Sequence, residues 1–426
     1  MERLGGVILR KKWIVCIIGL FLVYALAMYI YLFHGANTAI PDSIKGTSAD
    51  PATFMNKEMI EKSETYSKIR NFFFFISTPL EWLFYAIVLV SGLSKGIEKW
   101  GKLTWKRRSV QISAYVFWLS LLLFIVFLPL SYIRYKISLD YGISIQAFSS
   151  WMKDNLIEFW VDLGMTLIVV LVLYWLIQKS PARWWLYSWL LCIPFTIFVM
   201  FIQPVVIDPL YNDFYPLKDK VLEERILDLA AKADIPAEHV YEVNMSEKTN
   251  TLNAYVTGVG SNSRIVLWDT TLNSLEDDEI LFIMAHEMAH YVEKHIYLGI
   301  GGYLLLMLVG LWLADKWMKR SIRKRGNLYH LDSMSDIRSL PLFLLTTSIL
   351  LFAANPITNY VSRVQETRAD TYALKMTDNP EAAISSFQKL SEKGLSQMNP
   401  PMLVKLFRNS HPTMLERIEM AERYVK

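Results

Sequence analysis

The chain has 426 residues, of which 53% are hydrophobic and only 20% are charged, and its mean hydropathy is +0.26. This composition excludes two or three ordinary soluble domains and fits a polytopic membrane protein with a substantial water-facing part. The formal net charge of +4 is too small, for this length, to indicate a nucleic-acid partner. The two cysteines form neither a CxxC motif nor a disulfide framework.

Seven apolar segments follow one another along the chain, and each is long enough to cross a hydrocarbon core of roughly 30 Å. The first has basic residues before it and no small-residue cleavage site after it, so it predicts a retained anchor rather than a signal peptide. The second contains Glu81, which we expect to line a wet chamber, because a charge facing lipid is costly. The segments are 13–33, 72–93, 109–133, one from near Asp162 to Gln178, 184–207, 296–314 and 339–360.

Two stretches of the chain, residues 208–295 and 361–426, are too polar to span a membrane. Because two apolar segments separate them, seven crossings place both stretches on the same side. Together they are long enough for one globular domain with its own core, built from two pieces of chain. We therefore divide the chain into 1–207 with membrane helices one to five, 208–295, 296–360 with membrane helices six and seven and a basic loop, and 361–426.

The first polar stretch contains the patterns of a helix, short strands and a second helix, in that order. An amphipathic helix is predicted at 218–233. Strands are predicted at 240–243 and 264–268, with 253–256 a third candidate between them. Ser274 then opens the second helix, because an aspartate three residues later has the form of a capping box and the acidic run there suits the helix dipole.

That second helix continues into His286-Glu287-Met288-Ala289-His290, an HExxH motif. Histidines four residues apart project from one helical face and can share one tetrahedral zinc ion. Glu287, beside them, can act as general base on a zinc-activated water. The alternative is a pair of histidines on a helix surface, but the strands and the capped helix ahead of the motif favour a metalloprotease with one Zn²⁺ per chain.

The zinc needs a third protein ligand, and the residues after the motif lack the glycine and third histidine of metzincins. Glu366 is the best candidate, since it begins the second polar stretch on the same side of the membrane as the motif. Asp370 lies four residues on, on the same helical face, where it can hydrogen-bond a zinc-bound imidazole. The alternative for both carboxylates is an ordinary surface helix. His295, which ends the motif helix, is a weaker candidate for supporting a ligand.

Further patterns occur in order along the chain. They are KEMIEKS at 57–63, YGIS at 141–144, PLYNDFYPL at 209–217, LNAY at 252–255, RIVLWDT at 264–270, ETRAD at 366–370, and SHP at 410–412 with ERI at 416–418. With the HExxH motif, they make the chain resemble the type I CAAX prenyl proteases over nearly its whole length. That family consists of integral-membrane zinc metalloendopeptidases with seven transmembrane helices around a large chamber.

The resemblance implies roles for individual residues, beginning with the zinc ligands and base already indicated by spacing. Asn253 and Ala254 would lie on an edge strand that pairs with the peptide backbone of the substrate. His411 would donate a hydrogen bond to the tetrahedral oxyanion, although its position alone suggests a surface histidine at a helix N-terminus. Arg417 would order the site or contact the substrate.

The chain departs from the family pattern in two places. Residues 246–252 lack the histidines of the family's corresponding stretch, and Ala285 and Ala289 replace the glycines that flank its HExxH motif. Both departures concern substrate preference more than chemistry.

The expected fold is a mainly α-helical membrane protein, with seven transmembrane helices around a chamber. A zincin-like domain, made of a small β-sheet and the HExxH helix, would be formed by the two polar stretches. The expected function is an integral-membrane zinc metalloendopeptidase for peptides or proteins that are small, unfolded or membrane-associated. The first alternative is C-terminal processing of prenylated proteins. The alternative of another class is a membrane scaffold or transporter with a structural zinc site.

The distribution of basic residues predicts which face of the cell membrane carries the catalytic domain. The loops on the N-terminal side hold 19 Lys and Arg in 57 residues, whereas the short loops on the catalytic side hold 8 in 61. The positive-inside rule then places the N-terminus in the cytoplasm and the catalytic domain outside. The alternative is a cytosolic catalytic domain, as expected for enzymes that process prenylated proteins.

Overall fold

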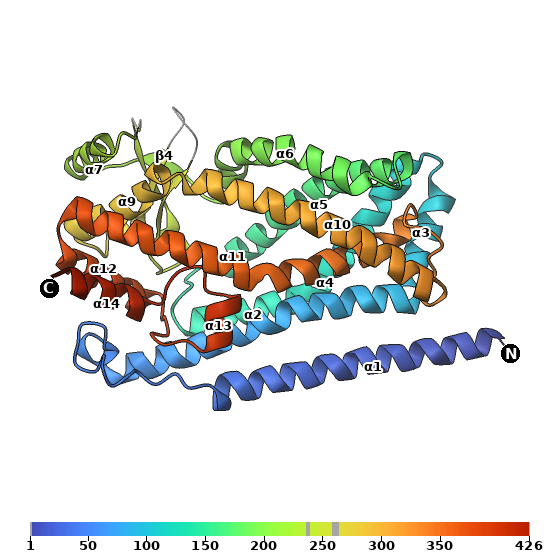
Figure 1. Cartoon of the computed structure of the whole chain (residues 1–426), viewed down its shortest axis with the longest axis horizontal. Helices are drawn as coiled ribbons and strands as arrows, with labels where there is room; N and C mark the ends of the chain where they lie inside the picture. The colour runs from blue at the N-terminus through green and yellow to red at the C-terminus, as the bar shows by residue number, and fades with distance from the viewer. Residues whose placement is uncertain (1, 236–238, 258–263, 426) are drawn as a thin grey trace.

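Long helices run along the longest axis of the molecule and carry a small sheet and several shorter helices at one end (Figure 1). In a computed structural model, residues 2–235, 239–257 and 264–425 are described. The helices are α1 (Glu2–Ile30), α2 (Lys57–Ser91), α3 (Leu93–Thr104), α4 (Arg108–Asp140), α5 (Phe148–Lys179), α6 (Trp184–Ile202), α7 (Lys220–Lys232), α8 (Asp269–Leu272), α9 (Asp277–Val292), α10 (His295–Tyr329), α11 (Leu340–Thr377), α12 (Pro380–Lys393), α13 (Met402–Phe407) and α14 (Met414–Val425).

Seven helices within the described residues are long and apolar enough to cross a membrane, which confirms the predicted number. They are α1, α2, α4, α5, α6, α10 and α11. Several extend beyond their apolar segments: α2 has 35 residues and begins at Lys57, fifteen residues before the apolar segment 72–93. Hydropathy marks only the part of a helix that suits hydrocarbon, whereas the helical backbone continues through polar residues of good helix propensity.

A cavity of about 630 Å³ lies among α2, α4, α5 and α11, within the membrane-spanning part of the molecule. Its wall includes Glu81, Arg134, Glu158 and Asp162 among apolar side chains. Glu81 accepts a hydrogen bond of 3.3 Å from the hydroxyl of Ser348 on α11. The prediction that this intramembrane carboxylate lines a chamber is confirmed.

The sheet is mixed and has four strands in the order β1-β2-β4-β3. The strands are β1 (Phe214–Pro216), β2 (Val240–Val243), β3 (Ala254–Thr257) and β4 (Arg264–Trp268). The central pair β2 and β4 is parallel, and both outer pairs are antiparallel. The predicted strands 240–243 and 264–268 have the observed bounds, and β3 lies one residue after the prediction. The short strand β1 was not predicted, because its three residues, Phe214–Pro216, are too few to show an alternation of apolar and polar side chains.

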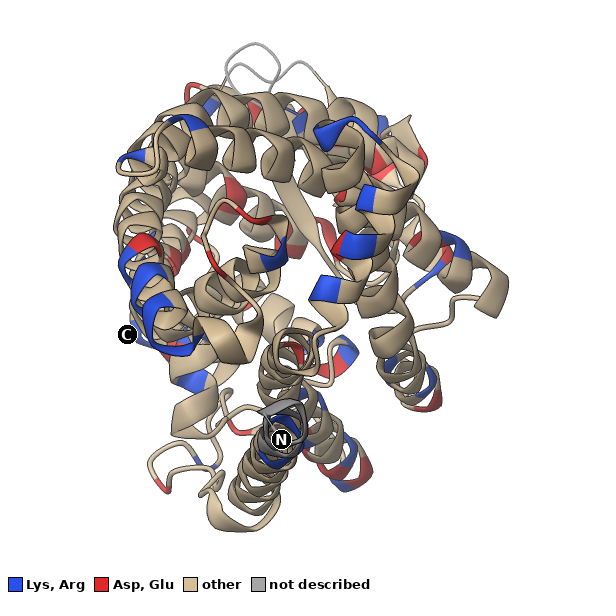
Figure 2. Cartoon of the chain, turned by 90° about the vertical axis from the view of Figure 1, so that its right-hand side faces the viewer, with Lys and Arg blue, Asp and Glu red and all other residues tan. Residues whose placement is uncertain are grey.

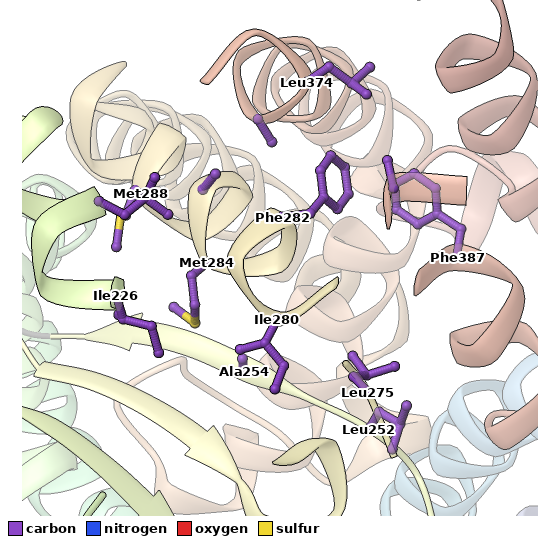
Figure 3. Packing of buried hydrophobic residues seen from close by; sticks show 14 of the residues in the cluster. Ile226, Leu252, Ala254, Leu275, Ile280, Phe282, Met284, Met288, Leu374 and Phe387 are labelled. Atoms are coloured by element: carbon purple, nitrogen blue, oxygen red, sulfur yellow. The ribbon is translucent and has the colours of Figure 1, made fainter. Parts of the chain in front are cut away.

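One hydrophobic cluster joins the first polar stretch to the second. It contains Ile226, Ile265 and Ile280 from the first, together with Leu374 and Phe387 from the second. Figure 3 shows Ile280 and Met284 of α9 pointing toward the sheet while Phe282 points the other way, toward Phe387. The rings of Phe282 and Phe387 meet edge to face, with centroids 5.3 Å apart. Helix α9 is therefore held between the sheet and the C-terminal helices.

The start of α9 differs from the sequence prediction. Glu276, not Ser274, is the N-cap residue, and it forms a capping box with Glu279. The side chain of Glu279 accepts from the backbone N–H of Glu276 at 2.7 Å and also binds Lys389 of α12 at 2.8 Å. Glutamate is not one of the usual N-cap residues, but here the capping box and the contact from α12 to Glu279 support the later start.

Candidate metal centre and active site

Helix α9 carries His286, Glu287 and His290 into a site completed by Glu366 of α11. The two helices pack against each other. Fully buried alanines occur on both, at positions 285 and 289 of α9 and 369 and 373 of α11. Small side chains allow helix axes to approach closely, which brings ligands from two distant chain segments together. The alanines that replace the family's glycines are therefore accommodated in the packing.

The donor atoms of His286, His290 and Glu366 have the spacing of ligands around one small ion. The two Nε2 atoms are 3.3 Å apart. Glu366 Oε2 lies 3.1 Å from His286 Nε2, and Glu366 Oε1 lies 3.5 Å from His290 Nε2. A tetrahedral ion with bonds of about 2.05 Å separates its ligands by about 3.3 Å. In addition, Glu366 Oε2 is buried and accepts no hydrogen bond from the described residues. The three side chains therefore fit a small metal ion such as zinc.

His286 is held from behind by a buried ion pair. Its Nδ1 lies 2.7 Å from Asp370 Oδ1, and Arg417 binds Asp370 through two nitrogens at 2.6 and 2.8 Å. The Arg417 guanidinium also lies over the ring of Phe387, 4.3 Å from its centroid. Burial alone would lower the pKa of His286, but the Asp370 carboxylate raises that pKa to about 9. Asp370 therefore fixes the tautomer that presents Nε2 to an ion.

His290 is held by a longer chain of contacts. Its Nδ1 lies 2.9 Å from Nδ1 of His295, whose Nε2 lies 3.1 Å from Glu293 Oε2. Arg368 of α11 binds the same Glu293 oxygen at 2.6 Å. The geometry requires a turn between α9 and α10, where Lys294 adopts φ of 57°. Burial, with His286 nearby, lowers the pKa of His290 to about 4 and so keeps this imidazole neutral.

His295 is the supporting residue that sequence reasoning ranked too low. The sequence placed it at the end of the motif helix, whereas it is the first residue of α10. Only the left-handed turn at Lys294 brings it back beside His290. Its position five residues after the HExxH motif was the one signal in the sequence.

Glu287 and His411 lie on the open side of the metal ligands. Both line a cavity of about 380 Å³ together with His286. Burial raises the pKa of Glu287 to about 7, and the neighbouring His286 opposes this shift. His411 Nε2 lies 3.3 Å from Glu366 Oε2, and the His411 side chain is 55% exposed. A carboxylate and an imidazole therefore lie in the cavity beside the three candidate metal ligands.

Ala254 begins β3, the edge strand of the described sheet, and Asn253, predicted on the same strand, directly precedes it; both line the cavity. The Asn253 carbonyl accepts from the backbone N–H of Trp268 at 3.1 Å. Since hydrogen-bonding directions alternate along an antiparallel strand, the backbone groups of Ala254 face the open edge. The N–H of Ala254 meets only the side-chain oxygen of its neighbour Asn253, at 3.0 Å, among the described residues. An extended peptide can add to this edge.

Every residue that the sequence placed in the site thus lies at or next to one cavity. Arg417 differs from the others, because it is only 7% exposed and its guanidinium is taken up by Asp370. Its contacts favour ordering of the site over contact with substrate.

Comparisons with known proteins agree with this geometry. The model of peptidase family M48 matches residues 216–425, and the model described as CAAX prenyl protease N-terminal, five membrane helices, matches residues 32–213. The "Uncharacterized metalloprotease YhfN" of Bacillus subtilis (strain 168) is 54% identical over 413 residues, covering 97% of each chain. A "CAAX prenyl protease 1 homolog" of Arabidopsis thaliana is 26% identical, covering 85% of this chain and 87% of that one.

A crystal structure of S. mikatae Ste24p has the same fold, with a TM-score of 0.81 at 23% identity, covering 97% of this chain and 98% of that chain. The fold, the site and the matches define an integral-membrane metalloendopeptidase, which confirms the predicted class of enzyme. The chain belongs to peptidase family M48, with the N-terminal membrane region of the CAAX prenyl proteases. The predicted resemblance is confirmed.

Proposed function

We propose that the protein hydrolyses peptide bonds with one zinc ion held by His286, His290 and Glu366. The observation that carries the proposal is the spacing of these three donor groups, 3.1 to 3.5 Å apart, beside a carboxylate in an open cavity. A zinc ion bound there would act as a Lewis acid and bring the pKa of a water toward about 7.

The protein groups around that position have separable tasks. Glu287 accepts the proton of the attacking water and later delivers it to the leaving amine. His411 donates a hydrogen bond to the oxygen that becomes negative in the transition state. The edge of β3 at Asn253 and Ala254 holds the substrate backbone extended. Asp370 and Arg417 keep His286 in place, so that little reorganisation is needed during the reaction.

Replacing Glu287 with Gln tests the reaction class. The variant keeps all three ligands, so it should retain one zinc per chain while cleavage of a test peptide falls by at least about a hundredfold. Zinc content by atomic absorption and turnover by mass spectrometry are measured on the same purified protein. The rival scaffold or transporter, with zinc purely structural, predicts no zinc-dependent turnover for the wild type. Equal turnover in wild type and variant would contradict the assigned base.

The substrates that we propose are peptides or proteins that are small, unfolded or membrane-associated. The site opens toward a cavity bounded by α2, α9 and the C-terminal helices, which restricts entry of folded chains. Prenylated proteins are the second candidate, since relatives in Arabidopsis thaliana and Saccharomyces cerevisiae are named CAAX prenyl protease 1 or its homolog. Cleavage of matched peptides with and without a farnesylated cysteine separates the two. Strict dependence on the lipid would favour prenyl-protein processing.

We also propose that the catalytic domain faces out of the cytoplasm. The support is the excess of Lys and Arg at the opposite end of the molecule, where Figure 2 shows basic residues on several helix ends. Alkaline phosphatase, active only outside the cytoplasm, should be active when fused after Lys426. The loop between α10 and α11 is shorter than the sequence indicated, because α10 continues to Tyr329. The matched fusion is therefore placed in that loop, after Asp332. An inactive, stable C-terminal fusion with an active Asp332 fusion would reverse the assignment.

A further inference from the structure

Two arginines that have no task in the proposed reaction line the cavity at the metal site. Arg70, on α2, and Arg408, which follows α13, line the same cavity as His286, Glu287 and His411. Neither arginine belongs to any sequence pattern discussed above. A third arginine, Arg134, lines the neighbouring intramembrane cavity.

Within the described part of the chain, Arg70 and Arg408 form no ion pair with a carboxylate. None of the ion pairs formed among the residues that the structure describes includes Arg70, Arg134 or Arg408. Arg408 donates to the side-chain oxygen of Asn71, and the Nε of Arg70 is buried with no hydrogen-bond partner among the described groups. Their guanidinium groups lie over aromatic rings instead, 5.7 Å from the ring centroid of Tyr66 and 6.0 Å from that of Phe74.

Other arginines nearby show what a structural role looks like in this protein. Arg363 donates to the carbonyl oxygens of Lys405 and Asn409, both at 2.7 Å, and Arg417 is paired with Asp370. Among the described residues, Arg70 and Arg408 have neither a paired carboxylate nor two backbone carbonyl acceptors. Burial, together with the charges of Arg70 and Arg134, lowers the pKa of Arg408 to about 9. Partly buried like charges cost free energy that a bound anion would recover.

We propose that Arg70 and Arg408 bind a carboxylate of the substrate close to the scissile bond, so that they select which peptides are cut. This inference rests on the proposed peptidase function. A planar guanidinium matches a carboxylate with two parallel hydrogen bonds, and a peptide carries carboxylates at its C-terminus and on Asp and Glu side chains. The two arginines therefore recognise a carboxylate, which either the C-terminus of a peptide or an Asp or Glu side chain can provide.

Three versions of one peptide distinguish the two sources. The first has a free C-terminal carboxylate, the second a C-terminal amide, and the third a C-terminal amide with a Glu in place of a neutral residue near that end. With zinc-loaded wild-type protein in detergent, we expect kcat/KM for at least one carboxylate-bearing peptide to exceed that for the neutral amide about tenfold or more, mainly through KM. The better of the two carboxylate peptides identifies the source.

Two variants and a matched control assign the preference to these residues. Arg70→Gln and Arg408→Gln should each bring the ratio between the preferred peptide and the neutral amide toward one, and Arg408→Lys should restore part of it. Arg225→Gln removes an arginine that is 39% exposed and paired with Asp277 and Asp278 outside the cavity, so the ratio should persist. Zinc content and melting temperature establish that each variant is folded.

Binding provides a measurement that is independent of turnover. The Glu287→Gln protein should bind the preferred peptide more tightly than the neutral amide, and adding Arg408→Gln should remove that difference in Kd. Equal cleavage of all three peptides by the wild type would overturn the carboxylate site but leave the peptidase standing. A ratio that survives in both Arg70→Gln and Arg408→Gln would overturn the assignment to these arginines. No cleavage of any peptide would overturn the peptidase function, and the carboxylate preference with it.

Discussion

The two histidines of the site are supported in different ways, although both are contacted at Nδ1. Behind His286, Asp370 is fully buried and is held by Arg417, which is 7% exposed. Behind His290, the contacts pass through His295 and end on Arg368, whose side chain is 62% exposed. One ligand is thus anchored in the hydrophobic core and the other at the rim of the domain. A change behind His286 should therefore affect folding and metal binding together, whereas a change behind His290 should affect mainly the metal.

The largest effect should come from removing either imidazole, which tests whether both histidines serve one ion. His286→Ala and His290→Ala each leave two protein ligands, and two ligands and water seldom hold zinc. We expect zinc content to fall from about one ion per chain to near zero in both variants, with loss of cleavage. Full zinc occupancy in purified His286→Ala protein would show that the ion is held elsewhere.

Asp370→Ala should be the next largest change, and it should act on folding as well as on zinc. It leaves the buried Arg417 guanidinium without its partner, a situation that costs about 3–5 kcal/mol. We expect a lower free energy of unfolding for the metal-free protein, measured by chemical denaturation, and a zinc affinity weaker by about 10- to 100-fold.

A double variant serves as the control for Asp370. In Asp370→Leu with Arg417→Met the buried charge is removed with its partner, so most of the stability should return while zinc affinity stays low. If Asp370→Ala lowers zinc affinity without any loss of stability, the buried pair of Asp370 and Arg417 does not contribute to folding.

His295→Ala should weaken zinc binding less than the loss of a histidine ligand or Asp370→Ala does. It removes the hydrogen-bond partner of His290 Nδ1, so zinc affinity should weaken by about tenfold. Stability should change by less than Asp370→Ala produces, because the chain of contacts ends at an exposed arginine. Arg368→Ala is the matched control, since an exposed ion pair contributes about 0–1 kcal/mol. Isothermal titration with zinc compares the two, and equal affinities for His295→Ala and wild type would exclude a role for His295.

Much of the architecture was predictable because it depends on local pattern. Membrane helices require long apolar segments, and all seven were found from hydropathy alone. The side chains of β2 and β4 follow an alternating or continuous apolar pattern, so the sequence predicted the bounds of both strands to the residue. The capping of α9 was predicted at Ser274 but lies at Glu276, where Glu279 completes the capping box and also binds Lys389 of α12.

The sequence by itself determined the motif residues, their helical face and the side of the membrane that they share with Glu366. These depend on spacing within one helix and on counting crossings, both local properties. The spacing also indicated Asp370 as a partner of an imidazole, but only the tertiary structure decided that this imidazole is His286, what contacts His290, and which groups line the cavity. Arg417, His295, Arg70 and Arg408 come from four different helices or helix ends, and their contacts arise from packing between segments up to 337 positions apart. A hydrogen bond between such segments leaves no period in the sequence, because the chain that separates them is free to vary.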